Sequence, residues 1–378
     1  MRYFVTGATE FIGRAVVRQL IAKGHEVVTV ARRPDKYRES VDSGVEVMHG
    51  DILEKSTMSE AMLNVDGVFH MTSSYRLHSK DIASKQKLNM ELKGNVKAVL
   101  HDLREAQEQA KAHGMTVSER HNVVGTRNVL ELMKELKIPR GVYTSTLAVF
   151  SDTKGRMVHE NHRYRGPWNN EFERTKWKAH FEVAQPMIEE KRLPLIILLP
   201  GLAYGPGDTG FADEILNAFL RKKLRSIPKK TAFCWTHVDD IAQAHIAAME
   251  RGILGESYIV AGPAHTLEQA LETAHRLSGV PLPKKRLSPL SLRLSAVLAT
   301  PATVVRSLPE AYHPEALRTL AGTTSLGASD KARKDLDFEP RSLVEGLRET
   351  LAYDMRRLGM IAPPETAEEA KILELKPE

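Results

Sequence analysis

A glycine-rich turn near the N-terminus has the residue types and the spacing that a phosphate-binding loop needs. Residues 6–13 read TGATEFIG and lie between a short β-rich run and an amphipathic segment. Gly7 allows a tight turn out of the strand, and Gly13 lets the next helix pack closely with its N-terminus facing a diphosphate. The pattern predicts a dinucleotide site that includes Gly7, Thr9, Glu10, Phe11, Ile12 and Gly13.

Glu10 stands where such a turn usually carries its middle glycine. Its side chain crowds the backbone approach to a diphosphate, and its carboxylate repels the phosphate charges. We therefore expect weakened dinucleotide binding, which would be relieved if the carboxylate turned outward.

Two arginines end the second expected strand, where an acidic residue would bind the ribose hydroxyls of NAD. The sequence there is Ala31-Arg32-Arg33. Guanidinium groups can hold a 2′-phosphate, so Arg32 and Arg33 favour NADP(H) over NAD(H). The alternative interpretation is that both are solvated loop charges.

The third expected strand ends at Gly50-Asp51-Ile52, where an adenine ring would lie. Asp51 can accept a hydrogen bond from the adenine amino group, although a plain turn aspartate fits the sequence nearly as well. We include Asp51 and Ile52 in the predicted cofactor site, together with Pro200 at the end of a later strand.

A parallel sheet is needed to bring these residues to one edge. The run Tyr3–Thr6, the amphipathic segment Ile12–Lys23 and the run Glu26–Ala31 form a βαβ unit. The order repeats, with further strand candidates at 45–49, 67–71, 141–144 and 193–199. Six such runs alternating with helices predict an α/β fold built on a doubly wound Rossmann sheet.

The pattern changes after Pro200 to loops and helices, with one further strand at 257–260. We therefore predict an NAD(P)-binding domain at 1–200, a smaller C-terminal substrate-binding lobe at 201–360 and a mobile tail at 361–378.

An insertion at about 79–119 interrupts the first domain and is far longer than an ordinary connection between a strand and a helix. Its apolar residues from 92 to 110 recur every three or four positions, which predicts a helix with one apolar face. This helix either packs on its own domain or forms a lid or the contact of a homodimer.

Several motifs in succession resemble those of the NAD(P)-dependent epimerase/dehydratase family. This is the extended branch of the short-chain dehydrogenases and reductases, which includes dihydroflavonol reductases and 3β-hydroxysteroid dehydrogenases. The motifs are TGATEFIG, HGDILE, DGVFH, NVVGTRNVLELM, VYTSTLAVF, FERTK, LPGLAYGPGD and WTHVDDIAQAH. They cover residues 1 to about 355 apart from the insertion, and they imply the same fold.

The resemblance also implies a catalytic set of Ser/Thr, Tyr and Lys. The hydroxyl that orients a carbonyl falls on Thr146 with Ser145 beside it, and the lysine falls on Lys176. The tyrosine that exchanges the proton falls on Phe172, which has no proton to give. The usual acid and base position is therefore chemically empty.

Three tyrosines are candidates to replace the missing phenol: Tyr143, Tyr164 and Tyr204. Each is more typical of packing or of substrate contact. We expect an NADP(H)-linked oxidoreductase that acts, with impaired chemistry, on a hydroxyl or carbonyl group of a small organic substrate. The alternative is a non-catalytic ligand-binding or interaction protein; a sugar-nucleotide epimerase is disfavoured because those enzymes retain NAD.

His237, Asp239, Asp240 and His245 have side chains that can bind metals, but this stretch resembles the family's junction between lobes. We expect no metal there. The basic run at 221–230 fits a solvated helix end, or less readily a contact for an anionic substrate tail.

Length and composition are those of a globular protein: 378 residues, 42% of them hydrophobic, with a net charge of +6. The basic residues are scattered, which gives no indication of a nucleic-acid partner. Cys234 is the single cysteine and no signal peptide is evident, so we expect a cytoplasmic protein. The apolar stretch 290–308 is interrupted by Arg293, Pro301 and Arg306, which favours a packed helix pair over a membrane span, with peripheral membrane contact as the lesser alternative.

Overall fold

The structure is a computed structural model, which describes residues 1–35, 44–74, 108, 110, 112, 114–305 and 314–360. The helix predicted at 92–110 and the tail predicted at 361–378 lie almost entirely outside these residues.

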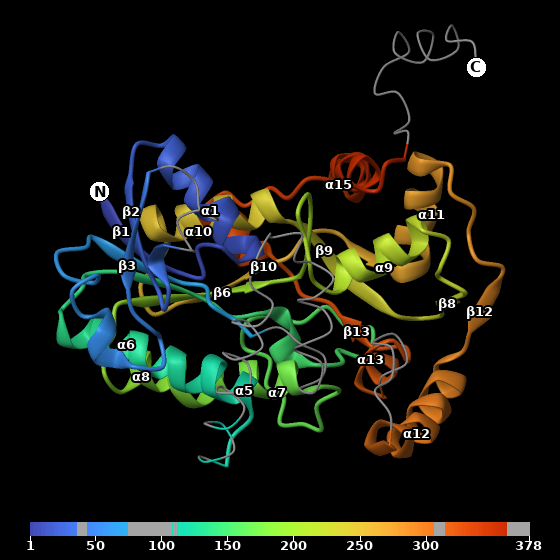
Figure 1. The fold of residues 1–378 in the computed structure, drawn as a ribbon, viewed down its shortest axis with the longest axis horizontal. Coiled ribbons are helices and arrows are strands. Elements are labelled where there is room, and N and C mark those ends of the chain that lie inside the picture. Colours follow the sequence, from blue (N-terminus) through green and yellow to red (C-terminus); the bar gives the residue numbers. More distant parts are fainter. Residues whose placement is uncertain are drawn as a thin grey trace, which may run out of the picture.

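A seven-stranded sheet forms one half of the molecule (Figure 1). Its strand order is β10-β6-β5-β4-β1-β2-β3, and all neighbouring strands are parallel. The strands are β1 (Arg2–Thr6), β2 (Glu26–Ala31), β3 (Val45–His49), β4 (Gly67–His70), β5 (Gly141–Thr144), β6 (Leu195–Pro200) and β10 (Ser257–Val260). The central strands β4, β5 and β6 are buried at every residue, as expected of a sheet covered on both faces. The predicted α/β fold is confirmed.

Helices cover both faces of this sheet (Figure 1). The helices α1 (Phe11–Ala22), α10 (Val238–Arg251) and α14 (Asp330–Leu336) share one apolar cluster with one face. The other face is covered chiefly by η2 (Arg120–Gly125), α6 (Thr126–Glu135), α7 (Glu171–Lys178), η4 (Ala179–Ala184) and α8 (Gln185–Glu189). Three short elements complete this half: η1 (Lys55–Met58), α5 (Val117–Glu119) and η3 (Leu147–Phe150).

A smaller lobe is built around β9 (Ala232–His237), which pairs with three other strands. These are β7 (Leu202–Tyr204), β11 (Ala264–Thr266) and β13 (Thr324–Ser325), and a separate pair joins β8 (Ser226–Pro228) to β12 (Lys285–Leu287). The helices of the lobe are α9 (Phe211–Leu220), α11 (Leu267–Ser278), α12 (Pro289–Val305), α13 (Pro314–Thr319) and α15 (Leu343–Arg357). The strand at 257–260 does not belong to this lobe, because β10 pairs with β6 in the large sheet.

The strands β1 and β4 are neighbours in the sheet, and successive strands are added in opposite directions on either side of them. From β1 the sheet continues through β2 to β3 on one side, and from β4 through β5 to β6 on the other. In doubly wound sheets, ligands bind outside the carboxyl ends of the strands at this point. The turn at 6–13 and the residues after β4 therefore border the expected ligand crevice.

Candidate dinucleotide and catalytic site

The turn after β1 has room for glycine alone at two positions. Gly7 has a φ of +73°, and a Cβ atom added there would lie 2.9 Å from the backbone nitrogen of Thr72. A Cβ atom at Gly13 would lie 1.9 Å from the carbonyl oxygen of Gly7, which is a severe clash. These close approaches hold the N-terminus of α1 against the end of β1. The predicted diphosphate contacts of this turn remain a prediction.

The Glu10 side chain points toward the residues that follow β4. It occupies the N-cap position of α1 but its side chain makes no capping bond there. Its Oε2 atom instead accepts a hydrogen bond from the backbone nitrogen of Ser73, at 3.1 Å, just beyond the end of β4. The outward orientation that would leave the diphosphate unhindered is therefore not the one found. Burial raises the pKa of Glu10 to about 8, against the opposing effects of the Ser73 N–H and of Lys176.

Lys176 is buried beneath the same edge of the sheet. Its Nζ donates a hydrogen bond to the carbonyl oxygen of Thr144 at 2.8 Å and lies 4.9 Å from the centre of the Tyr143 ring. Burial lowers the pKa of Lys176 to about 7, while the charge of Glu10 opposes that change. The helix α7 that carries Lys176 begins where the Asn170 side chain accepts the backbone N–H of Glu173, a regular N-cap.

The hydroxyl candidates lie directly after β5, the strand to which Lys176 is bonded. Thr146 is half-buried, and its Oγ1 accepts the backbone N–H of Ala148 at 3.2 Å. Ser145 is buried, and its Oγ is hydrogen-bonded to Nδ1 of His180 at 2.8 Å. Lys176 is thus bonded to the chain two residues before Thr146, whereas the hydroxyl of Ser145 is engaged with His180.

Phe172 lies one helical turn before Lys176 on α7 and is half-buried. Of the three tyrosines named as substitutes, two are fully buried and the third is hydrogen-bonded to a carbonyl. Tyr143 is fully buried beside His70, and burial raises the pKa of its phenol strongly. Tyr164 donates its hydroxyl hydrogen to the carbonyl of Pro167, and Tyr204 is buried in the other lobe against Trp235.

The predicted adenine end brings Arg32 and Asp51 near one another. Arg32 Nε lies 3.8 Å from Asp51 Oδ2, and the arginine side chain is 56% exposed. The other oxygen of Asp51 accepts the backbone N–H of Leu53 at 2.9 Å, which is the bond of an ordinary aspartate turn. The aspartate-turn interpretation describes this bond, and the adenine contact of Asp51 remains a prediction.

Three further predicted cofactor residues also lie on the crevice side of the large sheet. Arg33 follows Arg32 and is exposed, Ile52 is buried beside Gly125, and Pro200 ends β6 opposite Val260 of β10.

Sequence reasoning did not identify Asn122 and Ser73 as parts of the site. Asn122 in η2 is buried; its Oδ1 accepts the Ser74 N–H at 2.8 Å and its Nδ2 donates to Thr175 Oγ1 at 2.9 Å. It therefore joins the end of β4 to α7. The signal was present, because a buried asparagine within an apolar helical motif needs partners for its amide. Ser73 carried no such signal, and its buried Oγ has no partner among the described residues.

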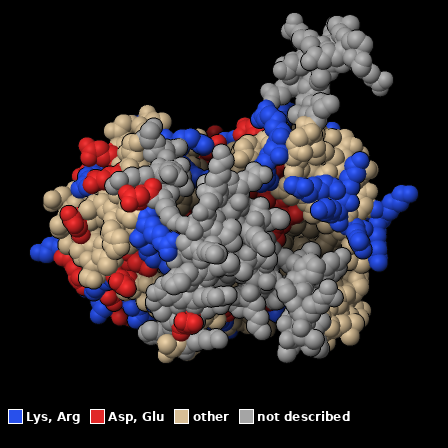
Figure 2. Space-filling model, viewed as in Figure 1, with Lys and Arg blue, Asp and Glu red and all other residues tan. Residues whose placement is uncertain are grey.

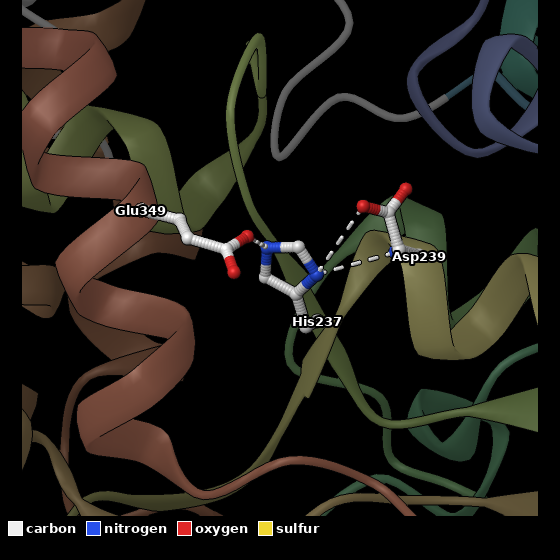
Figure 3. Close-up of side chains that lie close together, drawn as sticks. All are labelled: His237, Asp239 and Glu349. Carbon is white, nitrogen blue, oxygen red and sulfur yellow. Dashed lines mark hydrogen bonds and ion pairs between the residues drawn. The ribbon is translucent and has the colours of Figure 1, made fainter.

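His237 lies between two carboxylates at the junction of the lobes (Figure 3). Its Nδ1 accepts the backbone N–H of Asp239 at 3.3 Å, and its Nε2 lies 3.5 Å from Glu349 Oε2 on α15. The three side chains are close enough to share a cation. However, Arg341 donates to both oxygens of Glu349, at 3.0 and 3.1 Å, and Arg18 pairs with Asp239. The arginines neutralise both carboxylates, so the arrangement is typical of a polar junction.

Asp240 and His245, the other two candidate metal ligands, are bonded to other groups. Asp240 is paired with Arg341 at 2.9 Å, and His245 is hydrogen-bonded to Thr144 Oγ1 and to the carbonyl of Ile241, both at 2.7 Å. The absence of a metal there remains a prediction.

Comparison with known proteins identifies the family of the chain. A family model described as NAD(P)H-binding matches residues 7–213. The chain is 25% identical to sterol demethylase protein B of Methylococcus capsulatus, covering 96% of this chain and 100% of that protein. It is 27% identical to a putative dihydroflavonol 4-reductase of Synechocystis, covering 78% and 77%.

Among solved structures, the UDP-glucose 4-epimerase of Thermotoga maritima shares the fold, with a TM-score of 0.67 over 95% of this chain and 100% of that one at 18% identity. Matched over more than half its length and built on the same sheet, the chain belongs to the NAD(P)H-binding extended short-chain dehydrogenase/reductase family, in its epimerase/dehydratase branch.

Proposed function

We propose that the protein is an NADP(H)-linked oxidoreductase that acts on a carbonyl or hydroxyl group of a small organic substrate. One observation carries the proposal: the buried Lys176 donates to Thr144 at the end of β5, two residues before Thr146 and beside the crevice that Gly7 and Glu10 border. Burial of a lysine disfavours its charged form and costs stability. A lysine pKa near neutrality is typical of functional sites. Named relatives include reductases, such as the putative dihydroflavonol 4-reductase.

The residues at the crevice fit a dinucleotide in three respects. Gly7 and Gly13 leave the backbone open at the N-terminus of α1, where the helix dipole favours phosphate. The orphaned Oγ of Ser73 is suited to a ribose hydroxyl. Lys176 Nζ carries further N–H donors besides the one that is bonded to Thr144. Glu10 fits only while its carboxyl is protonated or displaced.

The proposed chemistry divides between cofactor and chain. A bound nicotinamide would supply or accept the hydride. Thr146 would hold a substrate oxygen by its hydroxyl, and Lys176 would bind the nearby ribose and stabilise negative charge. Phe172 gives no proton, so water must protonate the alkoxide, which makes the step slow compared with that of a tyrosine-containing enzyme.

The preference for NADP(H) rests on Arg32 and Arg33. No acidic side chain of the described residues stands at the end of β2, where NAD-binding proteins carry one. Arg32 keeps one long, 3.8 Å contact with Asp51 and is largely exposed, so its guanidinium can turn to a 2′-phosphate.

The test is a titration of the purified protein with NADPH, followed by a panel of aldehydes and ketones. Binding in the micromolar range that Lys176→Met weakens, and slow NADPH oxidation with some substrate, would support the proposal. Lys178→Met is the matched control, because Lys178 lies on the same helix but pairs with Glu119 at 2.7 Å. Tight NADPH binding that is unchanged by Lys176→Met would contradict the proposed site.

A second candidate is a non-catalytic member of the family. The observation that favours it is Glu10, whose carboxyl accepts the backbone N–H of Ser73 beside the turn predicted to bind the diphosphate. Together with Phe172, this would leave the fold as a ligand-binding or interaction module. Failure to bind NADPH at any pH between about 6 and 9, a range that spans the pKa of Glu10, would select this candidate.

A further inference from the structure

The helix α12 (Pro289–Val305) is apolar on two sides although it lies at the surface. Leu292 and Ala296 are buried against Leu317 and Ala321, next to α13. A helix that needs only one packing face usually carries polar residues on the other. Here the outward face is also largely apolar, although it includes the exposed Arg293 and Ser295, and this requires an explanation.

Four large side chains form the outward face of α12. They are Leu290, Leu294, Val297 and Leu298, with exposures of 68%, 57%, 69% and 78%. Their spacing of four, three and one places them along one stripe of the helix. These are the four most exposed large hydrophobic residues of the described chain apart from Met1. We call them the α12 stripe.

Basic residues adjoin the stripe. The strand β12 (Lys285–Leu287) runs directly into α12 and pairs with β8 (Ser226–Pro228), and Lys230 and Pro289 flank the same glycine, Gly322. Exposed cations surround these strands: Arg221, Lys222, Lys223, Arg225, Lys229, Lys230, Lys284 and Lys285. Figure 2 shows Lys and Arg gathered on this side of the molecule, over the place of β8 and β12 in Figure 1.

Acidic residues are absent from both segments that carry this charge. The sequences 221–230 and 281–308 contain no Asp or Glu. An apolar stripe beside a group of positive charges is typical of a helix that lies in the surface of an anionic bilayer. The apolar face of such a helix enters the boundary between headgroups and acyl chains.

A second copy of the chain is less suited to cover the α12 stripe. In a two-fold dimer the same surface meets itself, so the basic segments of both copies would be brought together and would repel each other. An anionic lipid surface offers the complementary charge.

We propose that the α12 stripe and its basic border dock the protein on an anionic membrane surface. The contact is peripheral: in the part of the chain that the structure describes, no helix is long and apolar enough to cross a bilayer. Lys284 and Lys285 contact lipid phosphates, while the stripe enters the boundary between headgroups and acyl chains.

The test is co-sedimentation of the full chain with vesicles of phosphatidylcholine alone and with vesicles that also contain phosphatidylglycerol. We expect binding to the anionic vesicles that weakens as salt rises, because screening shortens the range of the charges. Leu294→Gln with Leu298→Gln should reduce binding by roughly tenfold or more, and Lys284→Gln with Lys285→Gln by roughly tenfold. Both pairs are exposed, so the fold should survive, which circular dichroism verifies.

Ile253→Gln with Leu254→Gln is the matched control, since these residues are 54% and 46% exposed at the turn before β10. Control and unmodified protein should bind alike. Equal binding to both vesicle types would overturn the proposal, as would no binding to either. Self-association that is lost in the Leu294 and Leu298 variant, without vesicle binding, would show that a second copy covers the stripe.

Discussion

Glu10, at the N-cap of α1, and Lys176, on α7, lie close enough that the charge of each stabilises the charge of the other. Burial nevertheless dominates both: it raises the pKa of the carboxyl to about 8 and lowers the pKa of the amine to about 7. Below pH 7 the lysine is charged and the glutamic acid is neutral, which suits an anionic ligand. Above pH 8 the carboxylate is charged and the amine is neutral, which opposes one.

The affinity for NADPH should therefore fall as the pH rises from about 7 to about 9, because this range includes the pKa values of Lys176 and Glu10. We expect a loss of roughly tenfold, the effect of one nearby like charge in a partly desolvated site. Glu10→Gln keeps the size of the side chain and removes its charge, so much of the loss above pH 8 should disappear. Calorimetric titrations at several pH values measure this, and an equally steep fall in Glu10→Gln would assign the effect to other groups.

Glu10→Gly should strengthen dinucleotide binding beyond Glu10→Gln, because it also removes the side chain that reaches Ser73. The comparison at pH 6.5, where the carboxyl of the unmodified protein is largely neutral, isolates the steric part. Identical affinities for all three proteins at that pH would mean that Glu10 swings out of the crevice freely.

Arg32→Ala should weaken NADPH binding and leave NADH binding nearly unchanged. A charge-assisted hydrogen bond is worth about 1.5–3 kcal/mol, and we expect the lower end, roughly tenfold, because Arg32 is largely exposed and screened. Parallel titrations with both cofactors give the result. If the unmodified protein binds NADH as tightly as NADPH, the two arginines are solvated loop charges.

The large sheet was predictable from sequence because its strands are short apolar runs bounded by turns or helical segments. The strands of the lobe were not, since β7, β8, β11, β12 and β13 are two or three residues long and carry no period. Ser257–Val260 was recognised as a strand, but its partner was not, because pairing with β6 depends on how the chain returns from the lobe.

The residue types of the site were predictable, whereas their orientations were not. The position of Phe172 one turn before Lys176 follows from helical spacing alone. The direction of the Glu10 side chain depends on Ser73, which follows the strand β4, and the contact of His237 with Glu349 joins distant parts of the chain. Such long-range polar contacts leave no periodic signal in the sequence.

The pair of Asp240 and Arg341 should contribute strongly to stability. Asp240 has a side chain only 6% exposed, and Arg341 contacts it with its guanidinium at 2.9 Å and with its backbone N–H at 3.0 Å. Arg341→Met leaves this buried carboxylate with the backbone bond alone, which should lower the free energy of unfolding by about 3 kcal/mol. Urea unfolding measures the change. Adding Asp240→Asn should recover part of the loss, and a single-variant effect below about 1 kcal/mol would show that the pair behaves like a surface ion pair.

Phe172→Tyr should restore the missing proton donor. The substitution adds one hydroxyl to a ring already at the family's tyrosine position, and Lys176 one turn away would lower the pKa of the new phenol when charged. General acid catalysis typically contributes about 10²–10⁴-fold, so NADPH-dependent reduction of a responsive aldehyde or ketone should rise within that range. The gain should be larger in combination with Glu10→Gly, because the double variant also binds cofactor more tightly.

Phe181→Tyr is the matched control, since Phe181 lies on the following turns of the same helical segment and packs on Trp177. It should leave turnover unchanged, because its ring is engaged with other aromatic side chains away from Lys176. Initial rates at saturating NADPH separate the chemical step from cofactor affinity. If the unmodified protein already reduces a substrate with a kcat on the order of 10 per second, another group donates the proton and the role assigned to Phe172 is wrong.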